Sequence, residues 1–450
     1  MTGTGKNRAG NSAFQEWGAA SRPGAAACAK HYLERIAERE KEVGAWAWLA
    51  AEHAMHEAHE ADRNRSSEPL HGLILGVKDI IDTHDMPTGL GFRPYDQRRP
   101  VWDAGCVAAC RQAGAVVLGK TVTTEFAYFA PGKTRNPHDL MATPGGSSSG
   151  SAAAVADGMV DAAFGSQTAG SLIRPAAYCG VIGYKASHGA FGLSGIRPLA
   201  QSFDSLGIIS RSLHNIRAIR QLLSGQTVKP EPDTTRPPRL GFCRTAHWPE
   251  MEVVARMVVE RAVDALRESG AEIVEIASPE FYGSVLNDHA LIMAYEVARN
   301  YAFERDKYAD KLSEQFLALC NRGSSVSHDN YRAAQDRLHL AKSGFSQQIS
   351  EFDAWIAPSA LGEAPLANEG TGSPVMSLFW TALGMPCLAL PCGFGYNKRP
   401  LGIQLVSAPG LDETLLATAR WVERHLEWAY RLPRNEETQR QQTKSEEKTP

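Results

Sequence analysis

The chain has 450 residues, of which 43% are hydrophobic and 22% are charged, so it can bury a substantial core and is not a disordered polymer. Its 47 basic and 50 acidic side chains give a formal net charge of −3, which argues against a nucleic-acid binder that depends on a basic field. Its eight cysteines include no CxxC pair, which argues against a disulfide framework or a zinc ribbon.

Both ends of the chain are polar. Residues 1–12 and 434–450 contain few apolar side chains and are predicted to be disordered, which leaves 13–433 as the folded part. No apolar leader opens the sequence, so we expect a cytoplasmic protein. The longest stretch without a charged residue, 370–397, contains three prolines and is therefore predicted to form short buried strands rather than a membrane span.

Residues 24–64 are predicted to form helices with charged faces. Within them His53, His56 and His59 recur at every third position. A metal site is one interpretation of this pattern. The spacing drifts around a helix, however, and favours a solvated face, so we predict no metal site here.

Strand and helix patterns alternate after residue 72. An apolar strand at 72–82 is followed by a helix that ends at Gly114 and by a strand at 115–119; the same order recurs at 239–277. A Pro-rich connector, 225–238, precedes the second unit. Residues 285–350 are predicted to be helical, and strands at 353–360, 377–394 and 400–407 precede a final helix at 412–427. This alternation predicts an α/β layered sheet.

The segment with the clearest chemical pattern is 143–184, which reads TPGGSSSGSAAAVADGMVDAAFGSQTAGSLIRPAAYCGVIGY. A flexible linker is disfavoured because the serines lead directly into a helix-like run in apolar surroundings. Residues 146–150 match the GxSxG elbow of an α/β-hydrolase, but Pro144 and not a strand precedes them.

With the lysine of an earlier GVKD, this segment resembles the amidase signature family in order and spacing, closely over 70–215 and more loosely over 239–430. The resemblance implies an α/β fold: a single amidase-signature domain whose central mixed β-sheet is sandwiched between layers of α-helices. It also implies a catalytic triad, with Ser171 as nucleophile, Ser147 in a cis peptide bond as relay, and Lys78 as base. The two serines are 24 residues apart, as in the family.

A lysine can act as a base only when it is neutral. Lys78 lies in an apolar strand, where burial disfavours the ammonium form and lowers the pKa from its usual value of about 10.4. Alternation along the strand points Asp79 to the opposite face, away from Lys78. By local chemistry alone Ser148 or Ser149 could be the relay, and only the resemblance selects Ser147.

Small residues precede the nucleophile, so backbone N–H groups there can approach a carbonyl oxygen. The oxyanion hole is expected at Thr168, Ala169, Gly170 and Ser171. Substrate contacts are expected from the loops 126–132 and 373–380 and from a variable helical region at 285–345. The predicted substrate-binding residues are Gly146, Gln167, Tyr128, Phe129 and Trp380, although core packing explains the aromatic residues equally well. The mechanism needs no metal and no cofactor.

Three positions depart from the Asp-Thr-Gly-Gly-Ser-Ile-Arg run of many family members, which include the glutaminase subunit of tRNA amidotransferases. Gln167 replaces the aspartate, Ala169 replaces the first glycine, and the arginine is displaced to Arg174. Arg174 has two interpretations. It either holds a carboxylate of the substrate or braces the loop through an ion pair with an acid such as Asp204.

These departures favour a stand-alone amidase, an amidohydrolase of linear amides. Such an enzyme would hydrolyse a carboxamide through a seryl acyl-enzyme and release a carboxylic acid and ammonia or an amine. The expected partner is a small-molecule amide, with no nucleic acid and no membrane, and a homodimer is left open. The alternative is a glutaminase-type subunit of an amidotransferase complex that passes ammonia to a partner protein.

Overall fold

The structure is a computed structural model that describes residues 23–64, 67–225, 236–426, 428, 430 and 433. The segments predicted to be disordered, 1–12 and 434–450, lie outside the described residues, as does most of the connector at 225–238. Those expectations therefore stay predictions.

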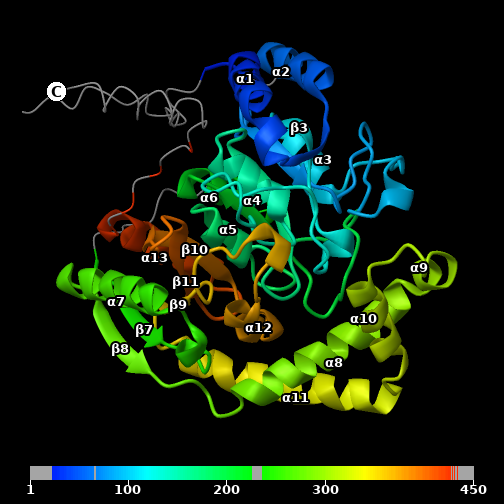
Figure 1. Cartoon of the computed structure of the whole chain (residues 1–450). Helices are drawn as coiled ribbons and strands as arrows, with labels where there is room; N and C mark the ends of the chain where they lie inside the picture. Colours follow the sequence, from blue (N-terminus) through cyan, green and yellow to red (C-terminus); the bar gives the residue numbers. More distant parts are fainter. Residues whose placement is uncertain are drawn as a thin grey trace, which may run out of the picture.

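One mixed sheet of eleven strands runs through the centre of the molecule (Figure 1). Its strand order is β1-β3-β2-β4-β6-β5-β10-β11-β9-β7-β8. The strands are β1 (Trp46–Leu49), β2 (Ile74–Lys78), β3 (Val116–Thr121), β4 (Ala162–Gln167), β5 (Ile182–Lys185), β6 (Ser205–Ser210), β7 (Arg239–Cys243), β8 (Glu272–Ile276), β9 (Ala354–Pro358), β10 (Cys387–Phe394) and β11 (Pro400–Val406). The predicted α/β fold with a mixed sheet is confirmed.

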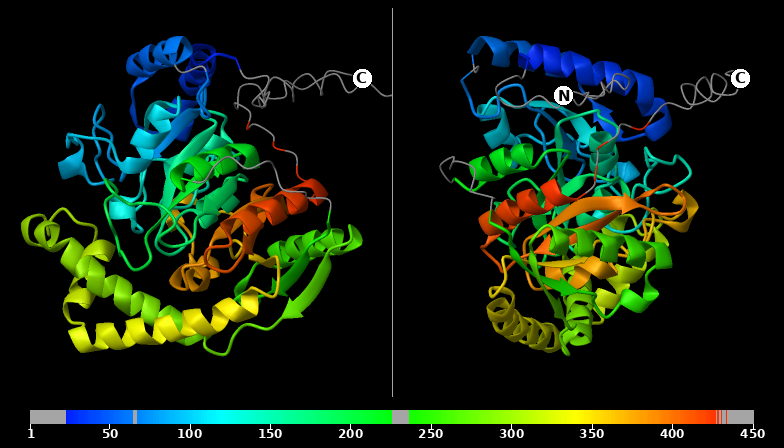
Figure 2. Two further views of the ribbon diagram at one scale, coloured as in Figure 1. Left: turned by 180° about the vertical axis from the view of Figure 1, so that it is seen from behind. Right: turned by 90° about the vertical axis from the view of Figure 1, so that its left-hand side faces the viewer.

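Helices cover both faces of this sheet, as Figure 2 shows from two further sides. They are α1 (Ala25–Val43), α2 (Ala51–Asn64), α3 (Gly105–Gln112), α4 (Ser149–Ala156), α5 (Ile173–Tyr178), α6 (Leu213–Leu223), α7 (Val253–Glu268), α8 (Tyr282–Asn300), α9 (Ala302–Lys307), α10 (Glu314–Ser324), α11 (His328–Ile349), α12 (Val375–Ala382) and α13 (Asp412–His425). The long helices α8 and α11 lie side by side at the bottom of Figure 1, with α10 packed on α8.

The pairing of β2 places the candidate site. β2 runs parallel to both β3 and β4, so the carboxyl ends of these strands meet at one edge of the sheet. Every residue of the three strands is buried, as expected for strands covered on both faces. Lys78 ends β2 and Gln167 ends β4, so the lysine and the loop that carries Ser171 emerge next to each other.

One expected strand is a helix in its first part. Residues 375–382, which overlap the range predicted as 377–394, form α12, and the strand begins only at Cys387. α12 is almost entirely apolar, and hydrophobic periodicity alone cannot distinguish a short buried helix from a buried strand. Pro374, at the N-terminal boundary, marks the point where the helix begins.

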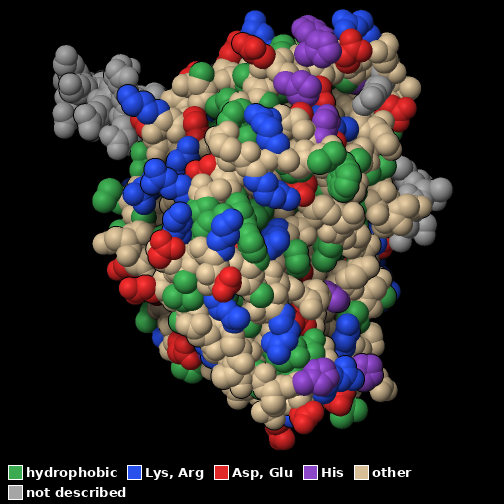
Figure 3. Space-filling model, turned by 90° about the vertical axis from the view of Figure 1, so that its right-hand side faces the viewer, with side chains coloured by type: hydrophobic (Ala, Val, Ile, Leu, Met, Phe, Trp, Pro, Cys, Tyr) green, Lys and Arg blue, Asp and Glu red, His purple; other side chains and the backbone are tan. Residues whose placement is uncertain are grey.

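Among the described helices, none has the length and apolar character that crossing a membrane would require. Acidic and basic side chains are interspersed on the face shown in Figure 3, in keeping with the small net charge.

Candidate active site

Lys78 is fully buried at the end of β2 and faces two hydroxyl groups. Its Nζ lies 2.7 Å from Oγ of Ser147 and 2.8 Å from Oγ of Ser166. Burial lowers the pKa of Lys78 to about 7, and the charge of Asp204 opposes this effect. Asp79 points elsewhere, since its carboxylate lies 3.3 Å from Lys120. The alternation expected along this strand is confirmed.

Ser147 lies on a tightly packed loop before α4. The peptide bond between Gly146 and Ser147 is cis, as the resemblance implied, and Gly145 has a positive φ of 82°. A Cβ at Gly146 would lie 2.9 Å from Cγ2 of Thr371 and 3.0 Å from Cγ2 of Thr124, so only glycine fits this position without displacing a neighbour. The Ser147 side chain is fully buried on this loop, beside Lys78.

Ser171 lies on the loop between β4 and α5, and its side chain is largely buried. The backbone N–H of Ser148 donates to the carbonyl of Ser171 at 3.1 Å, which ties the two serine loops together. In the described part of the chain no hydrogen bond joins the hydroxyls of Ser147 and Ser171. The structure therefore brings the three predicted catalytic residues to one place, and their roles stay predictions.

Some backbone N–H groups of the Ser171 loop have no hydrogen-bond acceptor among the described residues. The carboxamide oxygen of Gln167 accepts from the N–H of Leu172 at 2.9 Å and of Ile173 at 3.0 Å. Among the described residues, no acceptor lies opposite the N–H groups of 169–171. Unpaired N–H groups beside a candidate nucleophile are what an oxyanion hole requires.

Distant segments hold this loop. Nε2 of Gln167 donates to Oγ1 of Thr381 at 2.9 Å, and the same oxygen lies 2.7 Å from the carbonyl of Ala169. The hydroxyl of Thr168 donates to Asp204 at 2.6 Å, while Nε2 of His289 donates to the carbonyl of Thr168 at 2.8 Å. Gln167 is thus fully engaged inside the protein, and its predicted contact with a substrate stays a prediction.

Arg174 braces the loop through a different partner from the one expected. Its Nη2 donates to the carbonyl oxygen of Gly146 at 2.6 Å and lies 3.4 Å from the hydroxyl of Thr371. The carboxylate of Asp204 instead accepts from Thr168 and from the N–H of Leu199. The expected ion pair between Arg174 and Asp204 is therefore corrected to a bond with a neutral carbonyl.

A cleft of about 620 Å³ opens beside the Ser171 loop. It is lined by Tyr128, Phe129, Pro131, Tyr178, Glu252, Gln315, Leu361, Gly362, Glu363, Pro365, Glu369 and the segment 370–374. Pro374 connects the cleft to the loop, because a Cβ at Gly170 would lie 3.0 Å from its ring. Two of the predicted aromatic residues, Tyr128 and Phe129, therefore line a cleft that adjoins Gly170 through Pro374, whereas Ser171 is not among the residues that line it.

Trp380 does not line this cleft. Its side chain is fully buried in the core, with ring centroids 6.1 Å from Trp355 and 5.0 Å from Phe379. The prediction that Trp380 binds substrate is corrected to core packing, because it lies on the inward face of α12.

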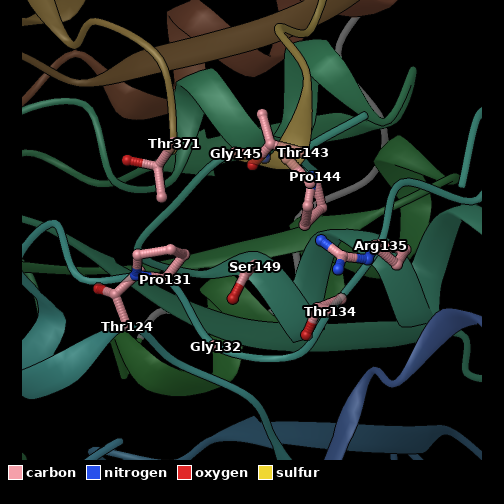
Figure 4. A pocket seen from close by; sticks show the side chains of 11 residues that line it. Thr124, Pro131, Gly132, Thr134, Arg135, Thr143, Pro144, Gly145, Ser149 and Thr371 are labelled. Atoms are coloured by element: carbon pink, nitrogen blue, oxygen red, sulfur yellow. The ribbon is translucent and has the colours of Figure 1, made fainter. Parts of the chain in front are cut away.

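A second cavity, of about 10 Å³, lies next to the segment that leads to Ser147, because Thr143, Pro144 and Gly145 line it (Figure 4). Thr124, Ser149 and Thr371 are among its lining residues. Thr371 and Pro131 line both cavities, so the two cavities adjoin each other at these residues.

Among the residues that the structure describes, two groups of side chains lie close enough to hold a metal ion, namely His53, Glu57 and Asp85, and His84, Asp85 and Asp103. Arg111 pairs with Glu57 and lies 2.8 Å from Asp85, so these carboxylates already have a cation. His53, His56 and His59 are exposed, as the prediction of a solvated face requires.

The amidase family model matches residues 27–416. The chain belongs to the amidase family. Among curated relatives, a protein from Roseiflexus castenholzii that is named as a subunit of glutamyl-tRNA(Gln) amidotransferase is 31% identical, over 89% of this chain and 92% of its own. The protein of the same name from Chloroflexus aggregans is 30% identical, over 89% and 93%.

Solved structures give the same picture of the fold. A crystal structure described as that of an amidase aligns with a TM-score of 0.82 and 28% identity, over 90% of this chain and 96% of that one. The peptide amidase of Stenotrophomonas maltophilia aligns with a TM-score of 0.78 and 25% identity, over 92% and 95%. A single domain of the amidase fold is therefore confirmed.

The relatives overturn the expectation of a stand-alone amidase that acts on a small-molecule amide. Proteins 30–31% identical over nine-tenths of the chain are named as one subunit of an amidotransferase, and such a subunit works with other proteins. The departures at Gln167, Ala169 and Arg174 therefore do not distinguish a stand-alone amidase from these subunits. The expected partners were a small-molecule amide and, left open, a second copy of the chain. This expectation is corrected as well, because the relatives are named as one subunit of a larger enzyme.

Proposed function

We propose that the chain is the amide-cleaving subunit of an amidotransferase, which frees ammonia from a glutamine-type carboxamide and passes it to a partner protein. The observation that carries this proposal is the similarity, over nearly the whole chain, to a subunit of glutamyl-tRNA(Gln) amidotransferase. The arrangement of Lys78, Ser147 and Ser171 supports it, because ammonia release needs a nucleophile, a base and an oxyanion site.

In this mechanism Oγ of Ser171 attacks the carboxamide carbon. The hydroxyl proton passes through Ser147 to the neutral amine of Lys78, and N–H groups of the 168–171 loop stabilise the oxyanion. Collapse of the tetrahedral intermediate breaks the C–N bond, and the nitrogen leaves as ammonia with the proton returned from Lys78. Water then attacks the ester, releases the carboxylic acid and restores the Ser171 hydroxyl.

The buried position of Lys78 supports its proposed role as base. With a pKa of about 7, about half of the Lys78 side chains are neutral at neutral pH. Its two hydroxyl neighbours keep the lone pair within hydrogen-bond distance of Ser147, and in the described part of the chain no carboxylate forms an ion pair with Lys78.

The proposal is tested by measuring ammonia release from glutamine by the purified chain, alone and after addition of the other amidotransferase subunits from the same cells. We expect a low rate alone and an increase of at least tenfold with the partners. A rate that is equally high without them would contradict the proposal. The Ser171→Ala variant serves as the control for contaminating glutaminase, and we expect no activity from it in either state.

A further inference from the structure

We propose that Arg174 is a positioning residue, which fixes the Ser147 relay by holding the carbonyl group of Gly146. The inference rests on the proposed function, because it assigns Arg174 to the proton path between Ser171 and Lys78. It makes no use of a contact between Arg174 and the substrate.

The geometry links Arg174 directly to the relay. Nη2 of Arg174 donates to the carbonyl oxygen of Gly146 at 2.6 Å, and that carbonyl belongs to the peptide group that carries the nitrogen of Ser147. A charge-assisted bond of this length is stronger than one between neutral groups and restricts the orientation of the peptide group. Movement of the Gly146 carbonyl would change the 2.7 Å separation between Ser147 and Lys78.

The backbone of Arg174 is tied to the nucleophile loop. Arg174 is the second residue of α5, three positions after Ser171, and its N–H donates to the carbonyl of Gly170 at 3.1 Å. The short helix α5 therefore carries Arg174 and begins two residues after the candidate nucleophile, Ser171. The bond from Arg174 to Gly146 therefore fixes the position of the loop that carries Ser147 relative to the loop that carries Ser171.

Arg174 is placed here at a cost in stability. Its side chain is buried, and among the described residues its Nε and Nη1 have no hydrogen-bond acceptor. No carboxylate in the described part of the chain compensates its charge, and burial lowers its pKa to about 10, so it still carries a proton at neutral pH. A buried cation without an anionic partner destabilises a fold, and such a group calls for an explanation other than stability.

Arg220 offers a matched control for a buried arginine in an ordinary ion pair. It lies on α6, is also buried, and pairs with Glu413 of α13. Its replacement should therefore lower stability and leave the catalytic loops in place. Replacement of Arg174 should instead leave stability unchanged or raise it and should displace the catalytic loops.

The experiment compares Arg174→Met, Arg174→Lys and Arg220→Met with the full-length wild type. The probe is a fluorophosphonate, which a serine nucleophile attacks at phosphorus with loss of fluoride, while the serine proton passes to the base. The rate of labelling at Ser171 is followed by intact mass, and the urea midpoint of unfolding is measured in parallel. This readout does not depend on the natural amide or on partner subunits.

We expect Arg174→Met to be labelled about 10²-fold more slowly, with a urea midpoint equal to or above that of the wild type. Arg174→Lys should recover part of the rate, because an ammonium group can still donate to the carbonyl but lacks the rigid fork of arginine. Arg220→Met should lose stability and keep the wild-type labelling rate.

Labelling of Arg174→Met at the wild-type rate would overturn the inference while leaving the proposed function intact. If Arg174→Met does not fold, a wild-type rate for Arg174→Lys would overturn it instead. A wild type that is not labelled at Ser171 would overturn the proposed function and, with it, this inference.

Discussion

The protonation state of Lys78 depends on which groups lie next to its amine and which charged groups lie away from it. Two serine hydroxyls lie within 2.8 Å of Nζ, while the neighbouring carboxylate of Asp79 is turned toward Lys120. The strand is buried on both faces, so water does not stabilise the ammonium form. These features together favour a neutral amine near pH 7, and a lysine on the surface would lack all of them.

The rate of the proposed reaction should therefore rise with pH. The base is active when neutral, so kcat/KM for ammonia release should increase through an inflection near the Lys78 pKa of about 7 and then level off. Burial raises the pKa of Asp204 to about 7, and once ionised its charge favours the ammonium form of Lys78, so Asp204→Asn should move the inflection to lower pH. A pH–rate profile of both proteins from about pH 5.5 to about pH 9 checks this. A flat profile, or an inflection at higher pH in the variant, would disagree with it.

Motif spacing was sufficient to predict that Lys78, Ser147 and Ser171 lie together, because each lies within a short and characteristic run. It was not sufficient to predict the side chains that hold them. Thr381 contacts Gln167 across 214 residues of sequence, and His289 contacts Thr168 across 121. Such pairs leave no local pattern, since a single threonine or histidine in a helix most often serves packing or solvation. Ser166, a direct neighbour of Lys78, was not predicted, because a single serine inside a buried strand carries no distinctive pattern.

At the scale of elements, the packing of α10 on α8 depends on a close approach of their backbones at one glycine. Gly323 of α10 faces α8 so closely that a Cβ there would lie 1.8 Å from the carbonyl oxygen of Ala294. Gly344, on the exposed side of α11, has no neighbour within 4 Å of the same position. The first glycine permits the packing of two helices, whereas the second only adds freedom to the unfolded chain.

Substitution by alanine should therefore have opposite effects at these two glycines. Gly323→Ala should lower the free energy of unfolding by about 1–3 kcal/mol through overpacking between α8 and α10. Gly344→Ala should raise it by about 0.5–1 kcal/mol, because alanine favours the helix. Urea unfolding followed by tryptophan fluorescence measures both. Equal shifts in the two variants would show that the close approach of α10 to α8 is not maintained.

The order of elements could be predicted where turn residues and periodicity agreed. Gly114, with a positive φ of 88°, ends the helical segment before β3 as expected. The expectation of helices over 24–64 is wrong at β1, whose four residues lie between α1 and α2 and are too few to carry a distinct pattern. The same limit applies to α12, whose apolar residues suit a strand and a helix equally.

At the scale of the molecule, the site needs both halves of the sheet. Lys78, Ser147 and Ser171 come from the part of the chain that contains β1–β6, whereas His289 on α8 and Thr381 on α12 come from the part that follows. β5 and β10 join the halves through antiparallel pairing. The cleft is likewise lined from both halves, so a fragment of the chain would carry the motif without its supports.

The central proposal is that Ser171 attacks the carboxamide carbon, so that the nitrogen leaves as ammonia and reaches a partner protein. The most direct test gives glutamine labelled with ¹⁵N in its amide to the assembled complex and measures the label in the amidated acceptor by mass spectrometry. We predict transfer of the label with the wild type, none with Ser171→Ala, and recovery of amidation in that variant when an ammonium salt replaces glutamine. Label transferred from glutamine by Ser171→Ala would contradict the account.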